Sequence, residues 1–126
     1  MATFTRACLS PGGTEGNGAG IQINGTTATD LHQGSTTVTT YHEVHIWASN
    51  TGTVTETLIL GVGYDTGGSA AAKDNFHYDI NPNETIYISP GFTLKGHATA
   101  KDISGELVAN NTTVNVGGYV NVIDQS

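Results

Sequence analysis

Basic residues, cysteine and long apolar runs are all scarce in this sequence, and each scarcity excludes a class of function. Four Lys and Arg residues stand against eleven Asp and Glu residues, which gives a formal charge of -7. Phosphate backbones and anionic lipid repel such a chain, so we expect no nucleic-acid partner and no membrane partner. No run approaches the roughly 18 apolar residues that a membrane helix needs. The single cysteine, Cys8, cannot form a disulfide within the chain.

Glycine and strand-forming residues dominate the remainder. The chain has 17 glycines and is rich in threonine and valine, whereas helix-forming residues are few and dispersed. Three stretches alternate apolar and polar side chains, which predicts strands with one buried face: TVTETLILGVGY (53–64), TLKGHATAKDI (93–103) and TVNVGGYVNVI (113–123). Turn sequences lie at 49–52, 81–84, 89–91 and 109–111, and 68–75 is too short for a stable helix, so we expect a loop there. The pattern predicts an all-β protein, an antiparallel β-sandwich of jelly-roll type.

The first 35 residues differ from the rest. The segment PGGTEGNGAG (11–20) is half glycine and has almost nothing to bury. We therefore predict a flexible Gly-rich N-terminal arm with edge strands over residues 1–35, followed by a β-sandwich domain over residues 36–126. Two interpretations stay open: a mobile end, or an arm that becomes ordered against a neighbouring subunit. The opening MATFTRACLS has no apolar core of signal-peptide length, so we expect assembly in a cytoplasm.

The stretch YHEVHIWAS (41–49) places two histidines around a glutamate and raises the question of a metal site. In a strand, successive side chains point to opposite faces, so His42 and His45 cannot share one ion. The helical zinc-protease pattern requires a histidine four residues after the first, and position 46 is Ile. We predict no metal and no cofactor. Val44 and Ile46 are expected in the core.

The opposite face of the same strand is the candidate contact surface. An outward Trp beside Tyr on a polar face is typical of interfaces. The candidate partner-contact residues are Tyr41, Glu43, His45, Trp47 and Tyr119. The alternative is that these aromatic residues merely cover the sheet.

Catalytic motifs are weak throughout. The glycine-rich GVGYDTGG lacks the lysine of a phosphate-binding loop, and no G-x-S-x-G sequence occurs. Nothing in the pattern pairs a nucleophile with a base. We predict no catalytic residues and expect that the chain is not an enzyme.

Three segments together resemble a known class of proteins: ATDLHQGST…YHEVHIWASNTGTVTETLILGVG, INPNETIYISPGFTLKGHATAKDIS and VNVGGYVNVI, between about residues 28 and 123. Their order is similar to that in small β-sandwich virion proteins of tailed bacteriophages. The resemblance implies a capsid decoration (cement) protein, often a trimer, or a neck or tail protein. It predicts a structural protein located in the virion that binds the major capsid protein as a homo-trimer.

A second function stays open beside it. A neck, tail or fibre-associated module could recognise a host surface glycan, because exposed aromatic side chains near Asp and Asn suit sugars. Trp47, Tyr64 and Asp65 are the residues that this alternative would use.

Overall fold

The computed structural model describes residues 2–65 and 76–125, and most of their regular structure is β-strand. The predicted loop at 68–75 lies outside the described residues. Within those two ranges, no helix has the length and apolar character needed to cross a membrane. The elements, in chain order, are β1 (Thr3–Cys8), the 3-10 turn η1 (Pro11–Gly13), β2 (Ile21–Gln22), β3 (Thr29–Gln33), β4 (Thr40–Asn50), β5 (Glu56–Asp65), β6 (Phe76–Ile80), β7 (Thr85–Lys95), β8 (Lys101–Leu107) and β9 (Val114–Asp124).

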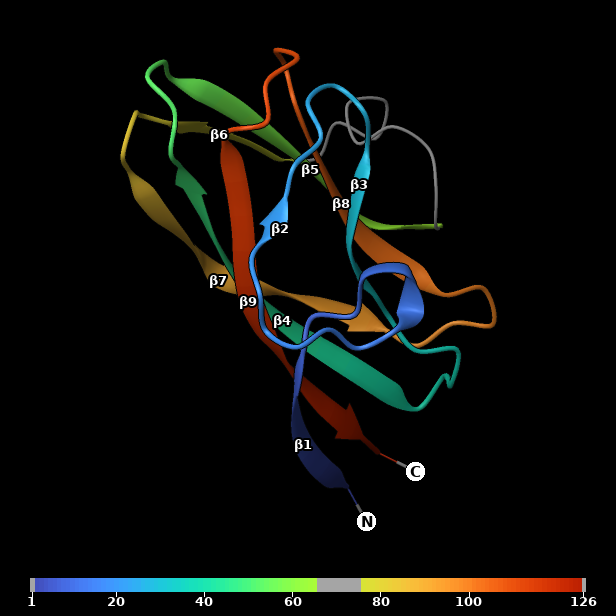
Figure 1. Ribbon diagram of the computed structural model, residues 1–126. Coiled ribbons are helices and arrows are strands. Elements are labelled where there is room, and N and C mark those ends of the chain that lie inside the picture. Colours follow the sequence, from blue (N-terminus) through green and yellow to red (C-terminus); the bar gives the residue numbers. More distant parts are fainter. Residues whose placement is uncertain (1, 66–75, 126) are drawn as a thin grey trace.

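Two antiparallel sheets make up the molecule (Figure 1). Sheet A has the strand order β1-β9-β4-β7, with β2 paired to β9, and sheet B has the order β3-β8-β5-β6. From β3 to β9, all connections but one cross from one sheet to the other. This is the arrangement of an eight-stranded jelly roll, with β2 as an addition. The predicted fold class, an all-β sandwich, is confirmed.

The core lies between the sheets and is aliphatic. Val44, Ile46 and Ala48 are buried on the inner face of β4, as the alternation predicts. Burial of such side chains supplies most of the stability of a domain this small. The buried core consists of Leu9, Ile23, Leu31, Val44, Ile46, Ala48, Leu58, Leu60, Ile80, Ile88, Leu94, Ile103, Leu107, Val114, Val116 and Val120.

The stretch 93–103 does not form the single strand that its alternation predicts. β7 ends at Lys95 and β8 begins at Lys101, because the chain crosses here from sheet A to sheet B. Gly96 lies at the crossing, where a Cβ atom would collide with the backbone carbonyl of Thr37. Ala98 and Ala100, which the alternation predicts on one side of a strand, lie in the connection between β7 and β8, where Ala98 is exposed and Ala100 is buried.

The turn predicted at 89–91 is also wrong, because Ser89, Pro90 and Gly91 lie inside β7. Val44 pairs with Phe92 and Ile46 pairs with Ile88, so these three residues face a single residue of β4. They form a bulge in a strand at the edge of sheet A, where a proline without an N–H is tolerated.

In β5 the face that the alternation predicts to be apolar is buried only at the centre of the strand. Leu58 and Leu60 are fully buried, but Val54 precedes the strand and is 55% exposed. A register shift between Val62 and Tyr64 leaves the Tyr64 side chain exposed. A bulge of this kind ends strict alternation, which the sequence pattern does not reveal.

Residues 3–33 supply strands to both sheets. Leu9, Ile23 and Leu31 of this segment are buried in the common core. Its connection between β1 and β2 is tied to β3: the Ser10 amide donates to His32 Nδ1 over 3.0 Å, and the Gln33 amide donates to the Ser10 carbonyl. The division into an N-terminal arm over residues 1–35 and a β-sandwich domain over residues 36–126, and any reach of the arm to a neighbouring subunit, stay predictions.

Candidate functional site

All five candidate contact residues lie on the outer face of sheet A. Tyr41, Glu43, His45 and Trp47 occupy alternate positions of β4, and the register places Tyr119 of β9 directly opposite His45. Trp47 is 36% exposed and the other four are half-buried. The prediction that His42 points to the other face is confirmed, since it shares the inner side with Val44.

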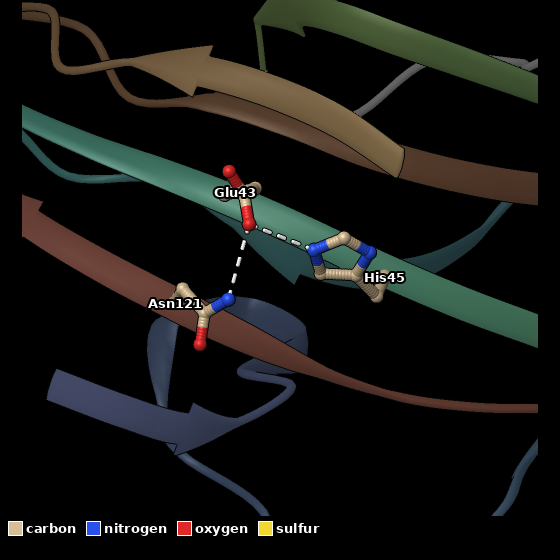
Figure 2. A network of polar contacts seen from close by, with 3 residues as sticks. All are labelled: Glu43, His45 and Asn121. Carbon is tan, nitrogen blue, oxygen red and sulfur yellow. Dashed lines mark hydrogen bonds and ion pairs between the residues drawn. The ribbon is translucent and has the colours of Figure 1, made fainter. Parts of the chain in front are cut away.

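A carboxylate held by two neighbours occupies the middle of this face (Figure 2). Glu43 Oε1 accepts a hydrogen bond from His45 Nε2 at 2.9 Å and one from Asn121 Nδ2 at 3.1 Å. Both bonds favour the ionised form, and the bond from His45 contributes most to the lowered pKa of Glu43. Since both bonds end on Oε1, the second oxygen, Oε2, keeps its capacity to accept.

Tyr119 is enclosed between two strands. The His45 ring stacks on it with centroids 5.0 Å apart and an interplanar angle of 23°. From β1, the Arg6 guanidinium lies 4.6 Å from the centroid of the same ring, within the range of a cation–π interaction. Arg6, Tyr119 and His45 therefore restrain one another across three strands.

Trp47 rests on a neighbouring strand that lacks a side chain at that point. Its register partner on β9 is Gly117, and a Cβ there would come within 2.5 Å of the indole Nε1 and 2.9 Å of Cε2. On the other side Trp47 pairs with Tyr87 of β7, with ring centroids 6.3 Å apart. Tyr87 is 76% exposed. The glycine thus lets the indole lie down on the sheet.

A groove of about 320 Å³ lies beside the bulge in β7. Ser89–Gly91 bow away opposite His45, which opens space between β7 and β4. The groove is lined by His45, Ile46, Trp47, Tyr87, Ile88, Ser89 and Tyr119.

Several residues that contact the candidates were not among them, and these include Arg6, Tyr87, Gly117 and Asn121. The alternation of 113–123 places Asn121 on the same side as Tyr119, so that signal was present in the sequence. Arg6 and Tyr87 reach the site only through pairing of β1 with β9 and of β7 with β4. Such long-range pairing is not written in the local pattern.

The residues that the glycan alternative combined do not lie together. Trp47 is on sheet A, whereas Tyr64 and Asp65 belong to β5 in sheet B. Asp65 forms an ion pair with Lys101. The prediction that these three residues combine in one site is wrong, because Trp47 belongs to one sheet of the sandwich and Tyr64 and Asp65 belong to the other.

The interior holds a second polar pair. The His32 and His42 rings are joined by a hydrogen bond of 2.7 Å between Nε2 and Nδ1, with His32 fully buried. Because His32 Nδ1 accepts from the Ser10 amide, its proton resides on Nε2, which donates to His42. Burial lowers the pKa of His32 to about 4, with a smaller contribution from His42. In the described ranges no three His, Cys, Asp or Glu side chains are grouped to hold a metal.

A substitution at Gly117 tests how Trp47 is seated. Gly117→Ala should lift the indole off β9, because the new methyl group would lie 2.5 Å from Nε1, too close for a contact between these atoms. We expect a shift of the emission of Trp47, the single tryptophan, to longer wavelength, with a change in unfolding free energy of about 1 kcal/mol or less. Fluorescence of the folded protein measures this. Gly20→Ala is the control, since a Cβ there meets only ordinary contacts at 3.8 Å and beyond. Unchanged emission in Gly117→Ala would contradict the described seating.

No family model matches the chain, and no curated protein matches it. Among solved structures, one of Bacillus endospore appendages, described as a family of disulfide-linked pili, aligns with a TM-score of 0.48 and 13% identity over 98% of this chain and 86% of that chain. The CBM22-1–GH10 modules of the Clostridium thermocellum N-terminal endo-1,4-beta-D-xylanase 10B, complexed with xylohexaose, align with a TM-score of 0.46 and 16% identity. That alignment covers 98% of this chain and 25% of that chain. Since both TM-scores lie below 0.5, the fold assignment rests on strand order and register, and the resemblance to phage proteins stays a prediction.

Proposed function

We propose that this chain is a structural virion protein that decorates the outer surface of a phage head and attaches through the free end of sheet A. The proposal takes up the sequence resemblance to phage virion proteins. It is supported by the jelly-roll fold, which viral capsid domains share. It assigns no catalytic step to the chain.

The observation that carries the proposal is the exposure of β1. Thr3, Phe4, Thr5 and Arg6 are all exposed, and Phe4 is 67% exposed. In Figure 1 this strand lies with both chain termini at one end of the molecule. Among the described strands β1 pairs with β9 alone, so its other edge is free to pair with a partner chain.

Apolar side chains continue from β1 across the sheet. Phe4 pairs with Ile123, which pairs with Tyr41 of β4, so the three side chains share one row of the outer face. Residues directly opposite in neighbouring strands have Cβ atoms about 4.5–5.5 Å apart. The row combines an exposed aromatic ring with a free strand edge, which suits docking on a protein surface.

The physical logic of decoration fits a small acidic domain. A charge of -7 keeps free copies apart before assembly. Repeated docking of a trimer would align three weak contacts, and linked contacts gain avidity without any new interaction. We propose the homo-trimer and the major capsid protein as the assembly and the partner on this basis.

Co-sedimentation with undecorated heads of the phage that encodes the chain tests the proposal. The full chain should bind saturably, and light scattering should give the mass of a trimer. Phe4→Ala should weaken binding at least about tenfold, as for a central aromatic contact. Deletion of residues 2–6 should act likewise and leave the fold intact, because these residues bury little.

Val108→Ala is the matched control, because Val108 is 62% exposed and lies outside the row. It should bind heads like the parent chain. Absence of binding by the full chain would overturn head decoration. Binding that Phe4→Ala leaves unchanged would place the docking surface elsewhere.

A further inference from the structure

The outer face of sheet A bears a second surface, distinct from the Phe4 row. It consists of Trp47 and Tyr87, the groove beside them and the fixed carboxylate of Glu43. Glu43 and Trp47 are four residues apart on β4, which corresponds to about 13 Å at the rise of a strand. We name this surface the aromatic platform.

The two rings of the platform contact each other and remain accessible to solvent. The indole of Trp47 lies over the Gly117 backbone and keeps 36% of its surface exposed, and Tyr87 keeps 76%. Stabilised rings that leave a face in solvent offer large apolar contact at little cost in ordering. A ligand with flat apolar C–H faces would stack there.

Polar groups alternate with the rings along the strand. Glu43 Oε2 can accept from a hydroxyl group, because the bonds from His45 and Asn121 both end on Oε1; Figure 2 shows the second oxygen turned away from both partners. His45 uses Nε2 for Glu43, which leaves Nδ1 facing the bulge of β7. Ser89 adds a hydroxyl group to the groove. Few, fixed polar groups beside apolar walls are what orient a small ligand.

The charge on the platform selects among ligands. The Glu43 carboxylate is ionised at neutral pH like any carboxylate, its hydrogen bonds hold it in place, and the chain as a whole is acidic. Among the described residues this face carries two cations: Arg6 is engaged with the Tyr119 ring, and the exposed Lys95 of β7 is the register partner of Tyr41, six residues along β4 from Trp47. Anionic ligands are therefore disfavoured, while a neutral ligand rich in hydroxyl groups can donate to the carboxylate.

We propose that the aromatic platform binds a neutral oligosaccharide, with sugar rings stacked on Trp47 and Tyr87 and hydroxyl groups bound to Glu43, His45 and Ser89. The site differs from the Trp47–Tyr64–Asp65 combination expected from the sequence. It does not depend on head decoration, because Trp47 and Tyr87, which would hold the sugar rings, lie at the opposite end of the face from Phe4.

Trp47 provides its own reporter, since it is the single tryptophan. The probes are soluble xylan, mixed-linkage β-glucan, galactomannan and dextran, with polygalacturonate as the anionic comparison. The parent chain should show a saturable change of emission with at least one neutral polysaccharide and be retarded by it in native affinity gels. Polygalacturonate should do neither. Trp47→Ala and Tyr87→Ala should each reduce retardation at least tenfold, and Glu43→Gln should reduce it several-fold.

Tyr64→Ala is the matched control, because Tyr64 is an exposed tyrosine of sheet B. It should bind as the parent does, and circular dichroism should confirm that all variants are folded. The proposal is overturned if none of the four neutral polysaccharides binds, or if Trp47→Ala binds like the parent. Loss of head binding in Trp47→Ala without any carbohydrate binding would assign the platform to protein docking instead. Retained sugar binding in a chain that ignores heads would reject decoration and leave the platform standing.

Discussion

Acidification from pH 6.5 to pH 4 should remove about 3 kcal/mol of unfolding free energy, mainly through the buried His32. Burial lowers the pKa of His32 from 6.5 to about 4 in the folded protein. Between these two values the unfolded chain binds a proton that the folded chain does not, so stability falls as the pH falls. The magnitude follows from about 1.4 kcal/mol for each unit of pKa difference.

The hydrogen bonds of the two imidazole rings explain why folded His32 does not readily take up a second proton. His32 Nδ1 already accepts from the Ser10 amide, and His42 Nδ1 accepts from His32. A proton added to either acceptor would break one of these bonds inside the sandwich. The pKa of His42 is also lowered by burial, which adds to the loss in the same direction.

Urea unfolding at several pH values measures this effect. His32→Gln should be less stable than the parent at pH 7 but show a much smaller decrease between pH 6.5 and pH 4. His97→Gln replaces an exposed histidine and should keep the slope of the parent. Protonation of Glu43 causes a separate loss of unfolding free energy at lower pH, because the pKa of this carboxyl group in the folded protein lies below its ordinary value of 4.5. Equal slopes for the parent and His32→Gln between pH 6.5 and pH 4 would refute the role of His32.

Leu9→Ala should destabilise the whole sandwich by roughly 2 to 5 kcal/mol, the usual cost of truncating a buried leucine. Leu9 is only 6% exposed and belongs to the core shared by both sheets. Its loss would leave a cavity where the chain passes from β1 toward β3. Because total stability of small domains is about 5–15 kcal/mol, the change is a large fraction of it.

Chemical denaturation with two probes, circular dichroism and Trp47 fluorescence, measures the effect. Val108→Ala serves as the exposed control and should change stability by less than about 0.5 kcal/mol. A loss below 1 kcal/mol in Leu9→Ala would show that the N-terminal segment lies outside the cooperative unit, in agreement with an independent arm. A large loss in one coincident transition would make residues 1–35 part of a single domain.

Local pattern was a sound guide where a strand runs straight through the sandwich. In β4 the alternation correctly separated Val44 and Ile46 from Glu43, His45 and Trp47, because side chains of a regular strand must alternate. It failed at Tyr64 and at Ser89–Gly91, where bulges insert extra residues. It failed again at Gly96, where the chain changes sheets.

The sequence by itself determined the all-β class and which face of β4 is turned to solvent. Composition and the alternation of apolar and polar side chains are local properties of the chain. Only the tertiary structure decided the site. Arg6, Tyr87 and Gly117 meet Trp47, His45 and Tyr119 because four strands distant in the chain pair in one register. That register depends on burying both inner faces at once, and no single segment carries this information.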